Sequence, residues 1–269
     1  MVIDIVNAVR SELVRTRRKG LVIGWLGLTV LAAVLINVVM FQVVDTAEAV
    51  PAAGPGVTFP TAEELARPEG LVAGLGAAAS MFGVITLSFW ALITATDYQT
   101  GLIRLLVSAQ PRRWILLTSK IIALVLWTAA VTTVAVIADL VVAPAVAGGS
   151  RIDVSAWREN VPATLAEGWL NLFCALVVWG IFGLAVAVVA RSSAIAISAG
   201  VGYVLVVESV IRAAADSLGD RLPGSTLSAL AQGGDATLSY GTALALGAAY
   251  TLVSIGIAQI VFHRRDITD

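Results

Sequence analysis

The chain has one cysteine, Cys174, and one histidine, His263, among its 269 residues. A single cysteine cannot form a disulfide within the chain, and a zinc site needs a group of His and Cys ligands that is missing here. A serine hydrolase needs a buried histidine beside its nucleophile, whereas His263 lies near the C-terminus in a polar tail. We therefore predict no catalytic residue and no metal site.

The sequence also lacks the G-x-x-x-x-G-K-[ST] loop with which many proteins bind the phosphates of ATP. The chain is thus expected to bind no cofactor of its own. If its function uses ATP and Mg²⁺, a separate chain must bind them.

Charged residues are scarce, at 13% of the chain, whereas 58% of the residues are hydrophobic. Soluble domains have about 25% charged residues, so the composition predicts an all-α, multispanning membrane protein. A helix needs about 20 apolar residues to cross the hydrocarbon core. Six spans are predicted, at residues 21–44, 71–96, 114–142, 164–190, 192–212 and 236–262. For the fifth span, a re-entrant segment is the alternative.

The basic residues predict the orientation, because Lys and Arg accumulate in short cytoplasmic loops. With the N-terminus inside, all but five of the 17 Lys and Arg residues lie on the cytoplasmic side. The five on the outer side are Arg67, Arg151, Arg158, Arg212 and Arg221. We therefore predict a protein of the cell membrane whose N- and C-termini are both cytoplasmic.

Residues 1–20 have an amphipathic pattern ahead of the first span. Val2, Val6, Val9 and Leu13 recur at helical spacing, which favours a helix lying in the inner membrane interface. A solvated cytoplasmic helix is the alternative. The basic start also resembles a secretory signal, but the apolar run of the first span is longer than the roughly 7 to 15 residues of a signal core.

Residues 97–110, between the second and third spans, are predicted to form a cytoplasmic helix at the start of a short amphipathic, basic segment that extends to Lys120. Its apolar residues Leu102, Leu105, Leu106 and Ala109 follow helical spacing. Pro111 disfavours helical geometry at Gln110, so the helix is expected to end there. The polar residues off this stripe are available to contact a partner on the inside.

The residue types and order in this segment resemble the coupling-helix region of the permeases of ABC exporters of the second type, the ABC-2 type permease family. The matching residues are Gly101, Arg104, Ser108, Pro111, Arg113 and Lys120. The ending Phe262-His263-Arg264-Arg265-Asp266-Ile267 is also similar to that of the family. Asp97 stands where a Glu is more usual in the family, and Ile103 replaces a common Leu.

The resemblance covers almost the whole chain and implies one transmembrane permease domain, residues 1–269, with an N-terminal elbow helix. It implies two copies of a cytoplasmic ABC ATPase subunit, which would bind ATP and Mg²⁺, and a second permease copy or a homologous permease. Membrane lipids are expected partners and nucleic acid is not. The residues expected to couple to the ATPase are Asp97, Gly101, Arg104, Ser108, Arg112 and Arg113.

The function that this family resemblance predicts is export of a small amphiphilic compound, drug, lipid or peptide from the cytoplasm or inner leaflet. The chain would not be an enzyme by itself. Two alternatives are an ATP-independent carrier or channel, which needs no coupling helix, and a membrane scaffold protein, which would stimulate no ATP turnover.

Four polar residues at membrane depth are candidates for the substrate path, because such residues are costly unless paired or facing an aqueous path. They are Asn37, Asn171, Glu208 and Arg212, and interhelical hydrogen bonding is the alternative for the two asparagines. Glu208 and Arg212 have the i, i+4 spacing of an ion pair on one helix face, so a purely structural pair is the alternative for them. Asp139 is expected to be hydrated near the outer interface. Residues 213–235 are predicted to form an outer loop or re-entrant helices.

Overall fold

The computed structural model describes residues 2–46, 59–214 and 219–264. Throughout these ranges the regular elements are helices. Five of them are long and apolar enough to cross a membrane. They are α2 (Lys19–Thr46), α5 (Ala79–Gln99), α7 (Arg113–Ala147), α8 (Val161–Ala190) and α13 (Tyr240–Arg264). The prediction of an all-α, multispanning membrane protein is thus confirmed at this level.

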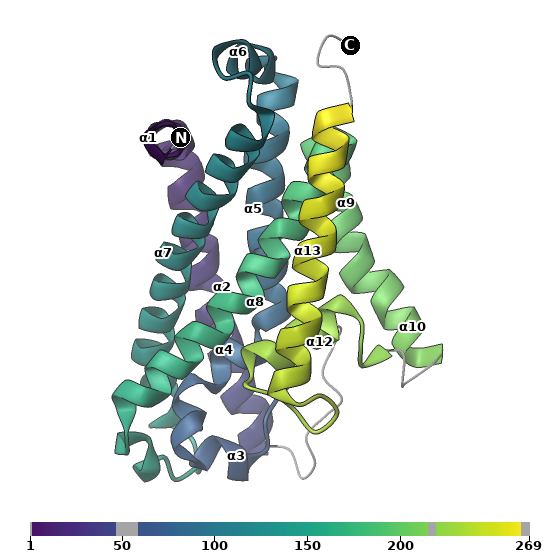
Figure 1. Cartoon of the computed structure of the whole chain (residues 1–269). Coiled ribbons are helices and arrows are strands. Elements are labelled where there is room, and N and C mark those ends of the chain that lie inside the picture. The colour runs from purple at the N-terminus through teal and green to yellow at the C-terminus, as the bar shows by residue number, and fades with distance from the viewer. Residues whose placement is uncertain (1, 47–58, 215–218, 265–269) are drawn as a thin grey trace.

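The shorter helices lie at the two ends of this bundle. α1 (Val2–Thr16) and α6 (Leu102–Ala109) lie at the same end as the last turn of α13, and α1 runs across the bundle axis (Figure 1). The opposite end contains α3 (Ala62–Ala66), η1 (Pro68–Val72), α4 (Ala73–Ala77), η2 (Ser155–Arg158) and α12 (Pro223–Ala231). We call the first the α6 end and the second the α12 end.

The second predicted span, residues 71–96, is not one helix. η1 and α4 occupy its first part, and α5 begins only at Ala79. Close packing explains the break: a Cβ on Gly70 would clash with the backbone of Leu65, and one on Gly74 with Asn37 and Asp139. The glycines therefore let this short segment fold back under the bundle before α5 starts.

The fifth predicted span, residues 192–212, is helical but divided. It consists of α9 (Ser193–Gly202), a π-helical turn (Tyr203–Val207) and α10 (Glu208–Ala214). α9 packs on α5 and α8, whereas α10 points away from the bundle (Figure 1). Neither piece alone has the length of a span, so the described helices support five spans and leave the sixth as a proposal.

The core of the bundle is the pair α5 and α8, which pack through two reciprocal tryptophan and glycine contacts. Trp179 of α8 lies against Gly83 of α5, and Trp90 of α5 lies against Gly180 of α8. A Cβ at either glycine would come closer than 3.0 Å to the indole ring. Both indoles are buried, so Trp179 acts as a packing residue.

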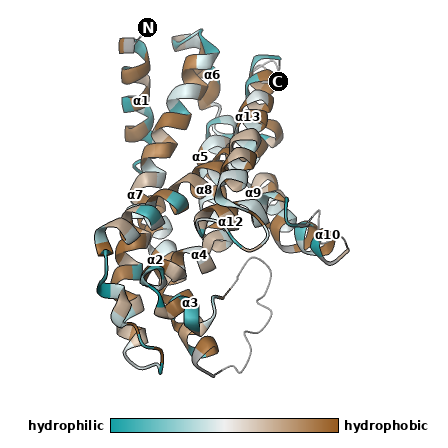
Figure 2. Ribbon diagram, turned by 60° about the horizontal axis from the view of Figure 1, so that its bottom comes forward, coloured by the Kyte–Doolittle hydropathy of each residue, from teal (hydrophilic) through white to brown (hydrophobic). Residues whose placement is uncertain are grey.

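Hydrophobic residues predominate along the long helices, and hydrophilic residues gather at helix ends and connections (Figure 2). α13 exposes Leu252 and Val253, and α2 exposes Ile23, Leu31 and Leu35. Apolar side chains exposed over the length of a helix are the expected outer surface of a protein whose solvent is lipid.

Candidate functional site

α6 begins directly after α5, and a single glycine makes the turn between them. Gly101 has a φ of 70°, in the left-handed region that favours glycine. The helix ends at Ala109, with Gln110 extended before Pro111, as the sequence predicted. Its start differs from the prediction: Asp97 belongs to α5, and the separate helix begins at Leu102 rather than at residue 97.

The two sides of α6 differ in burial. Ile103 is buried and Leu106 is half-buried against the bundle, whereas Arg104, Leu105 and Ser108 are exposed. Leu105 is 68% exposed, although its sequence spacing groups it with the apolar stripe. The exposed side of α6 therefore combines one large apolar side chain with a guanidinium and a hydroxyl. It projects from the α6 end of the bundle (Figure 1).

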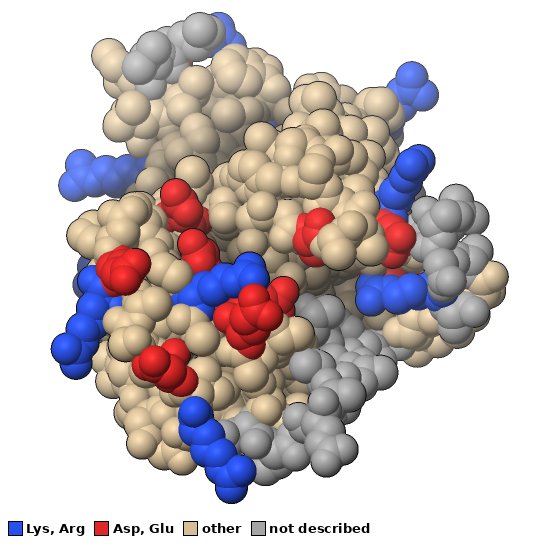
Figure 3. Space-filling view, turned by 90° about the horizontal axis from the view of Figure 1, so that it is seen from below, with Lys and Arg blue, Asp and Glu red and all other residues tan. Residues whose placement is uncertain are grey.

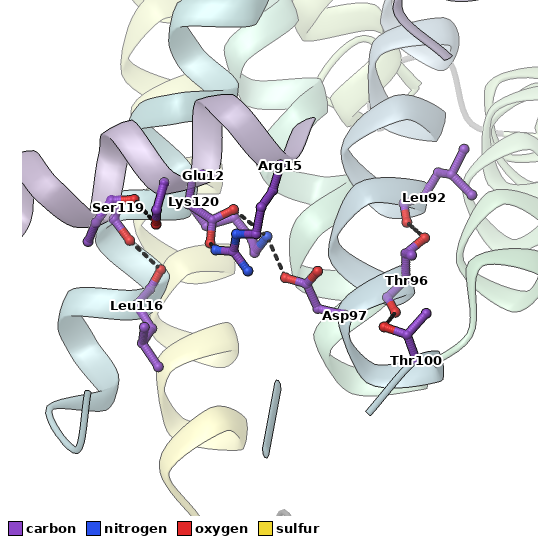
Figure 4. Close-up of polar contacts among 11 residues, drawn as sticks. Glu12, Arg15, Leu92, Thr96, Asp97, Thr100, Leu116, Ser119 and Lys120 are labelled. Atoms are coloured by element: carbon purple, nitrogen blue, oxygen red, sulfur yellow. Dashed lines mark hydrogen bonds and ion pairs between the residues drawn. The ribbon is translucent and has the colours of Figure 1, made fainter. Parts of the chain in front are cut away.

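A buried ion network connects α1, α5 and α7 next to α6 (Figure 4). The Lys120 Nζ atom of α7 lies 3.0 Å from Glu12 Oε2 of α1 and 2.7 Å from Asp97 Oδ2 of α5. Arg15 of α1 also pairs with Glu12. Glu12, Asp97 and Lys120 are all at most 8% exposed. One ammonium group thus connects α1, the helix before α6 and the helix after α6.

The apolar side of α6 faces this network across a small cavity. A cavity of about 20 Å³ is lined by Ile103 and Leu106 of α6, by Asp97 and Lys120 of the network, and by Phe262 of α13. This volume suits one water molecule, which needs roughly 10–15 Å³ of such space.

The two arginines after α6 have different surroundings. Arg112 is exposed. Arg113 instead donates hydrogen bonds from Nη1 to the carbonyl oxygens of Phe262 and His263, at 3.0 and 3.2 Å. A cation at the C-terminus of a helix is favourable because of the unpaired carbonyls there. Arg113 thus ties the start of α7 to the end of α13, which is a role inside the chain.

Asn37, one of the predicted substrate-path residues, is fully buried in a polar pair. Its Nδ2 donates to Asp139 Oδ1 of α7 at 2.6 Å and to the Ala33 carbonyl at 2.9 Å. Asp139 is 1% exposed, so the expectation that it is hydrated is wrong. The reason is that η1 and α4 fold over the ends of α2 and α7, and Gly74 lies directly on this pair.

Glu208 is also buried, at 3% exposure, and it accepts hydrogen bonds from the start of α12. The backbone N–H groups of Gly224 and Ser225 donate to its carboxylate at 3.0 and 2.7 Å. The predicted pair with Arg212 is present, at 3.4 Å. A carboxylate at a helix N-terminus satisfies amides that have no partner within the helix. Glu208 therefore caps α12 and joins it to α10.

The remaining two candidates, Asn171 and Arg212, line a cavity of about 730 Å³ at the α12 end. Acidic side chains gather around a hollow on this end of the molecule (Figure 3). The acidic residues that line the cavity are Glu64, Glu69, Glu167, Asp220 and Asp235. Glu208 and Asn37 do not line it. Of the four residues predicted for the substrate path, Asn171 and Arg212 thus line this cavity. Asn37 and Glu208 are instead buried in contacts within the chain.

Glu12 was missed by sequence reasoning. The valine stripe of α1 predicted a face toward the membrane interface and said nothing of the side that packs on the bundle, which contains Glu12 and Thr16. Arg15, three residues after Glu12, was a local signal of an ion pair. The partner Lys120 is 108 positions away, which no local pattern can identify.

No protein-family model matches the chain, and no curated protein sequence matches it.

Proposed function

We propose that this chain is the membrane permease subunit of an ATP-driven exporter of the ABC-2 type. In this proposal α6 is the coupling helix, and its exposed side docks on a separate cytoplasmic ATPase that binds ATP and Mg²⁺. The observation that carries the proposal is the exposed side of α6, which contains Arg104, Leu105 and Ser108. This helix lies next to the buried ions of α1, α5 and α7.

The chemistry of the exposed side suits a protein partner. Leu105 supplies an apolar anchor, and Arg104 and Arg112 supply cations for acidic side chains or helix carbonyls of the partner. Arg is enriched in protein interfaces, where its planar guanidinium makes directed hydrogen bonds. A channel or ATP-independent carrier gains nothing from such a surface, and a scaffold would have no reason to connect it to the core of the bundle.

The proposed substrate class is a small amphiphilic compound, drug, lipid or peptide. The acidic cavity at the α12 end would then lie on the outer side, as an exit chamber that favours cationic compounds. In the proposed complex Ser193–Ala214 forms the sixth span. The complex also contains a second permease copy and two ATPase copies.

The test of the proposed function is a charge reversal on α6. We expect Arg104→Glu to reduce copurification of the coexpressed cassette ATPase at least tenfold and to abolish transport, because it places a carboxylate where a cation meets the partner. Since Arg104 is exposed, the thermal stability of the permease should stay unchanged. The measurements are ATPase recovery by quantitative immunoblot and ATP-driven uptake into inverted vesicles.

Arg10→Glu is the matched control, because Arg10 is an exposed arginine of α1 at the same end of the bundle. It should leave ATPase recovery within twofold of the wild type. Equal recovery in the wild type and the Arg104→Glu variant would contradict α6 as the docking helix. Transport that continues without any ATPase would instead favour the carrier.

The proposed orientation can be tested by cysteine labelling in a Cys174→Ala background. A membrane-impermeant maleimide added to intact cells should label Ser155→Cys, which is exposed in η2 at the α12 end, and should leave Ser108→Cys in α6 unlabelled. Permeabilised cells should label both. Labelling of Ser108→Cys from outside intact cells would show that the α6 end faces outward.

A further inference from the structure

A second cavity at the α6 end is also lined by Glu12, Asp97 and Lys120 of the ion network. It has a volume of about 230 Å³ and is bounded by α1, α2, α5, α6 and α7. A water molecule occupies about 30 Å³ in the liquid, so the cavity has room for a ligand group much larger than water. Its polar lining includes Arg15, Thr16 and Arg18 from the junction of α1 and α2.

The charges that line this cavity do not balance. Three are basic, Arg15, Arg18 and Lys120, and two are acidic, Glu12 and Asp97. Lys120 pairs with both carboxylates, and Arg15 uses only Nη2 on Glu12. The internal ion pairs therefore leave a net positive charge in the lining of the cavity, and Arg15 and Arg18 carry it.

Arg15 also has donors without a partner. Its Nε and Nη1 atoms are buried, and they make no hydrogen bond to any residue in the described part of the chain. A buried donor that stays unpaired costs about 1–3 kcal/mol, and a charged one costs more. The side chain as a whole is 28% exposed, so the cavity is open to a ligand from outside. The contacts that Arg15 lacks are those that an anion would supply.

The position of the cavity indicates which class of anion it binds. It lies where α1, with its exposed Ile3, Val6 and Val14, crosses the end of the bundle. A helix with such an apolar face belongs at the boundary between headgroups and acyl chains. Basic pockets between membrane helices at this level suit the phosphate groups of anionic lipids, and arginine forms strong charge-assisted hydrogen bonds with phosphate.

We propose that Arg15 and Arg18 form a binding site for a phosphate group, which is supplied by the headgroup of an anionic phospholipid. The phosphate accepts hydrogen bonds from the guanidinium nitrogens that are unpaired within the chain, while the acyl chains lie along α2 outside the bundle. Bound there, the lipid neutralises the surplus charge beside Lys120 and braces α1 against α5. This site requires a membrane surface at the α6 end and does not depend on the exporter function or on an ATPase.

The test measures which lipids the purified full-length chain retains. The protein is equilibrated in detergent micelles containing equal amounts of phosphatidylglycerol and phosphatidylcholine, separated from free micelles, and analysed by quantitative mass spectrometry. We expect phosphatidylglycerol to be retained at least tenfold over phosphatidylcholine. Arg18→Gln should reduce that retention at least fivefold, because it removes a cation of the cavity and leaves the Glu12 pair intact.

Arg17→Gln is the matched control, because Arg17 is exposed in the same basic run and does not line the cavity. It should leave retention within twofold of the wild type. Arg15→Lys keeps the charge and loses the guanidinium donors, so it should lower retention without the loss of stability expected of Arg15→Gln. Inorganic phosphate at millimolar concentration should not displace the lipid.

Three results would overturn the proposal. Equal retention of the two lipids by the wild type would show that no anion site exists. An equal loss in the Arg17→Gln and Arg18→Gln variants would show that only the general surface charge attracts the lipid. Complete displacement by inorganic phosphate would assign the site to a soluble anion rather than to a membrane lipid.

Discussion

Replacing Lys120 by Met should lower the free energy of unfolding by about 3–5 kcal/mol, the cost of removing one partner from a buried ion pair. The variant leaves the carboxylate of Asp97 buried without a cation and leaves Glu12 with Arg15 alone, since Lys120 lies 3.0 Å from Glu12 and 2.7 Å from Asp97. Met has a similar length and flexibility, so the loss measures charge rather than packing. Denaturant-induced unfolding of the detergent-solubilised protein, followed by circular dichroism, gives the value.

Lys19→Met is the matched control, because Lys19 is exposed at the start of α2. Its effect should stay within about 0.5 kcal/mol. A double variant with Asp97→Asn added to Lys120→Met should recover much of the stability, because Glu12 keeps Arg15 as its partner and Asp97 no longer has an unpaired buried charge. If Lys120→Met were as stable as Lys19→Met, the network would not be holding α1, α5 and α7 together.

Replacing Glu208 by Gln should lower the free energy of unfolding by about 1–3 kcal/mol, the usual cost of leaving buried polar groups unpaired. The carboxylate accepts hydrogen bonds from the N–H groups of both Gly224 and Ser225. The glutamine amide can accept on one oxygen only and turns its own NH₂ toward the remaining donor. Arg212 loses its ion pair as well. Thermal and denaturant unfolding measure the loss.

Glu167→Gln is the control for Glu208, because it removes an exposed carboxylate at the same end of the bundle. Adding Arg212→Gln to Glu208→Gln should restore part of the stability, since it removes the unpaired cation. A role of Glu208 in the substrate path predicts a different result. In that case Glu208→Gln would unfold like the wild type but lose substrate-stimulated ATP hydrolysis.

Patterns of local origin were predictable from the sequence. Long charge-free runs identified the apolar helices, because membrane length and backbone hydrogen bonding leave few other solutions. Pro111 correctly predicted the end of α6, since a proline restricts the residue before it. The spacing of Glu208 and Arg212 predicted their ion pair. Each of these depends on residues only a few positions apart or on the composition of one segment.

Contacts between distant segments were not predictable. Glu208 pairs with backbone amides 16 and 17 positions away, and an N–H group has no signature in the sequence. The sequence predicted a hydrated Asp139 because it does not show that η1 and α4 fold over this residue. The same holds for α6, where Leu105 has the spacing of a buried residue and is nevertheless exposed. A helical period tells which residues share a face and not which face meets the bundle.

The paired tryptophan and glycine contacts of α5 and α8 fix their register. Sliding one helix past the other by one turn, about 5.4 Å, would move Trp179 from Gly83 onto Ala79 or Leu87. It would also move Trp90 from Gly180 onto Leu176 or Leu184. Both moves force a side chain into space that only a glycine leaves open. The two helices are therefore held in one axial register, and a slip by one turn is blocked at both tryptophans.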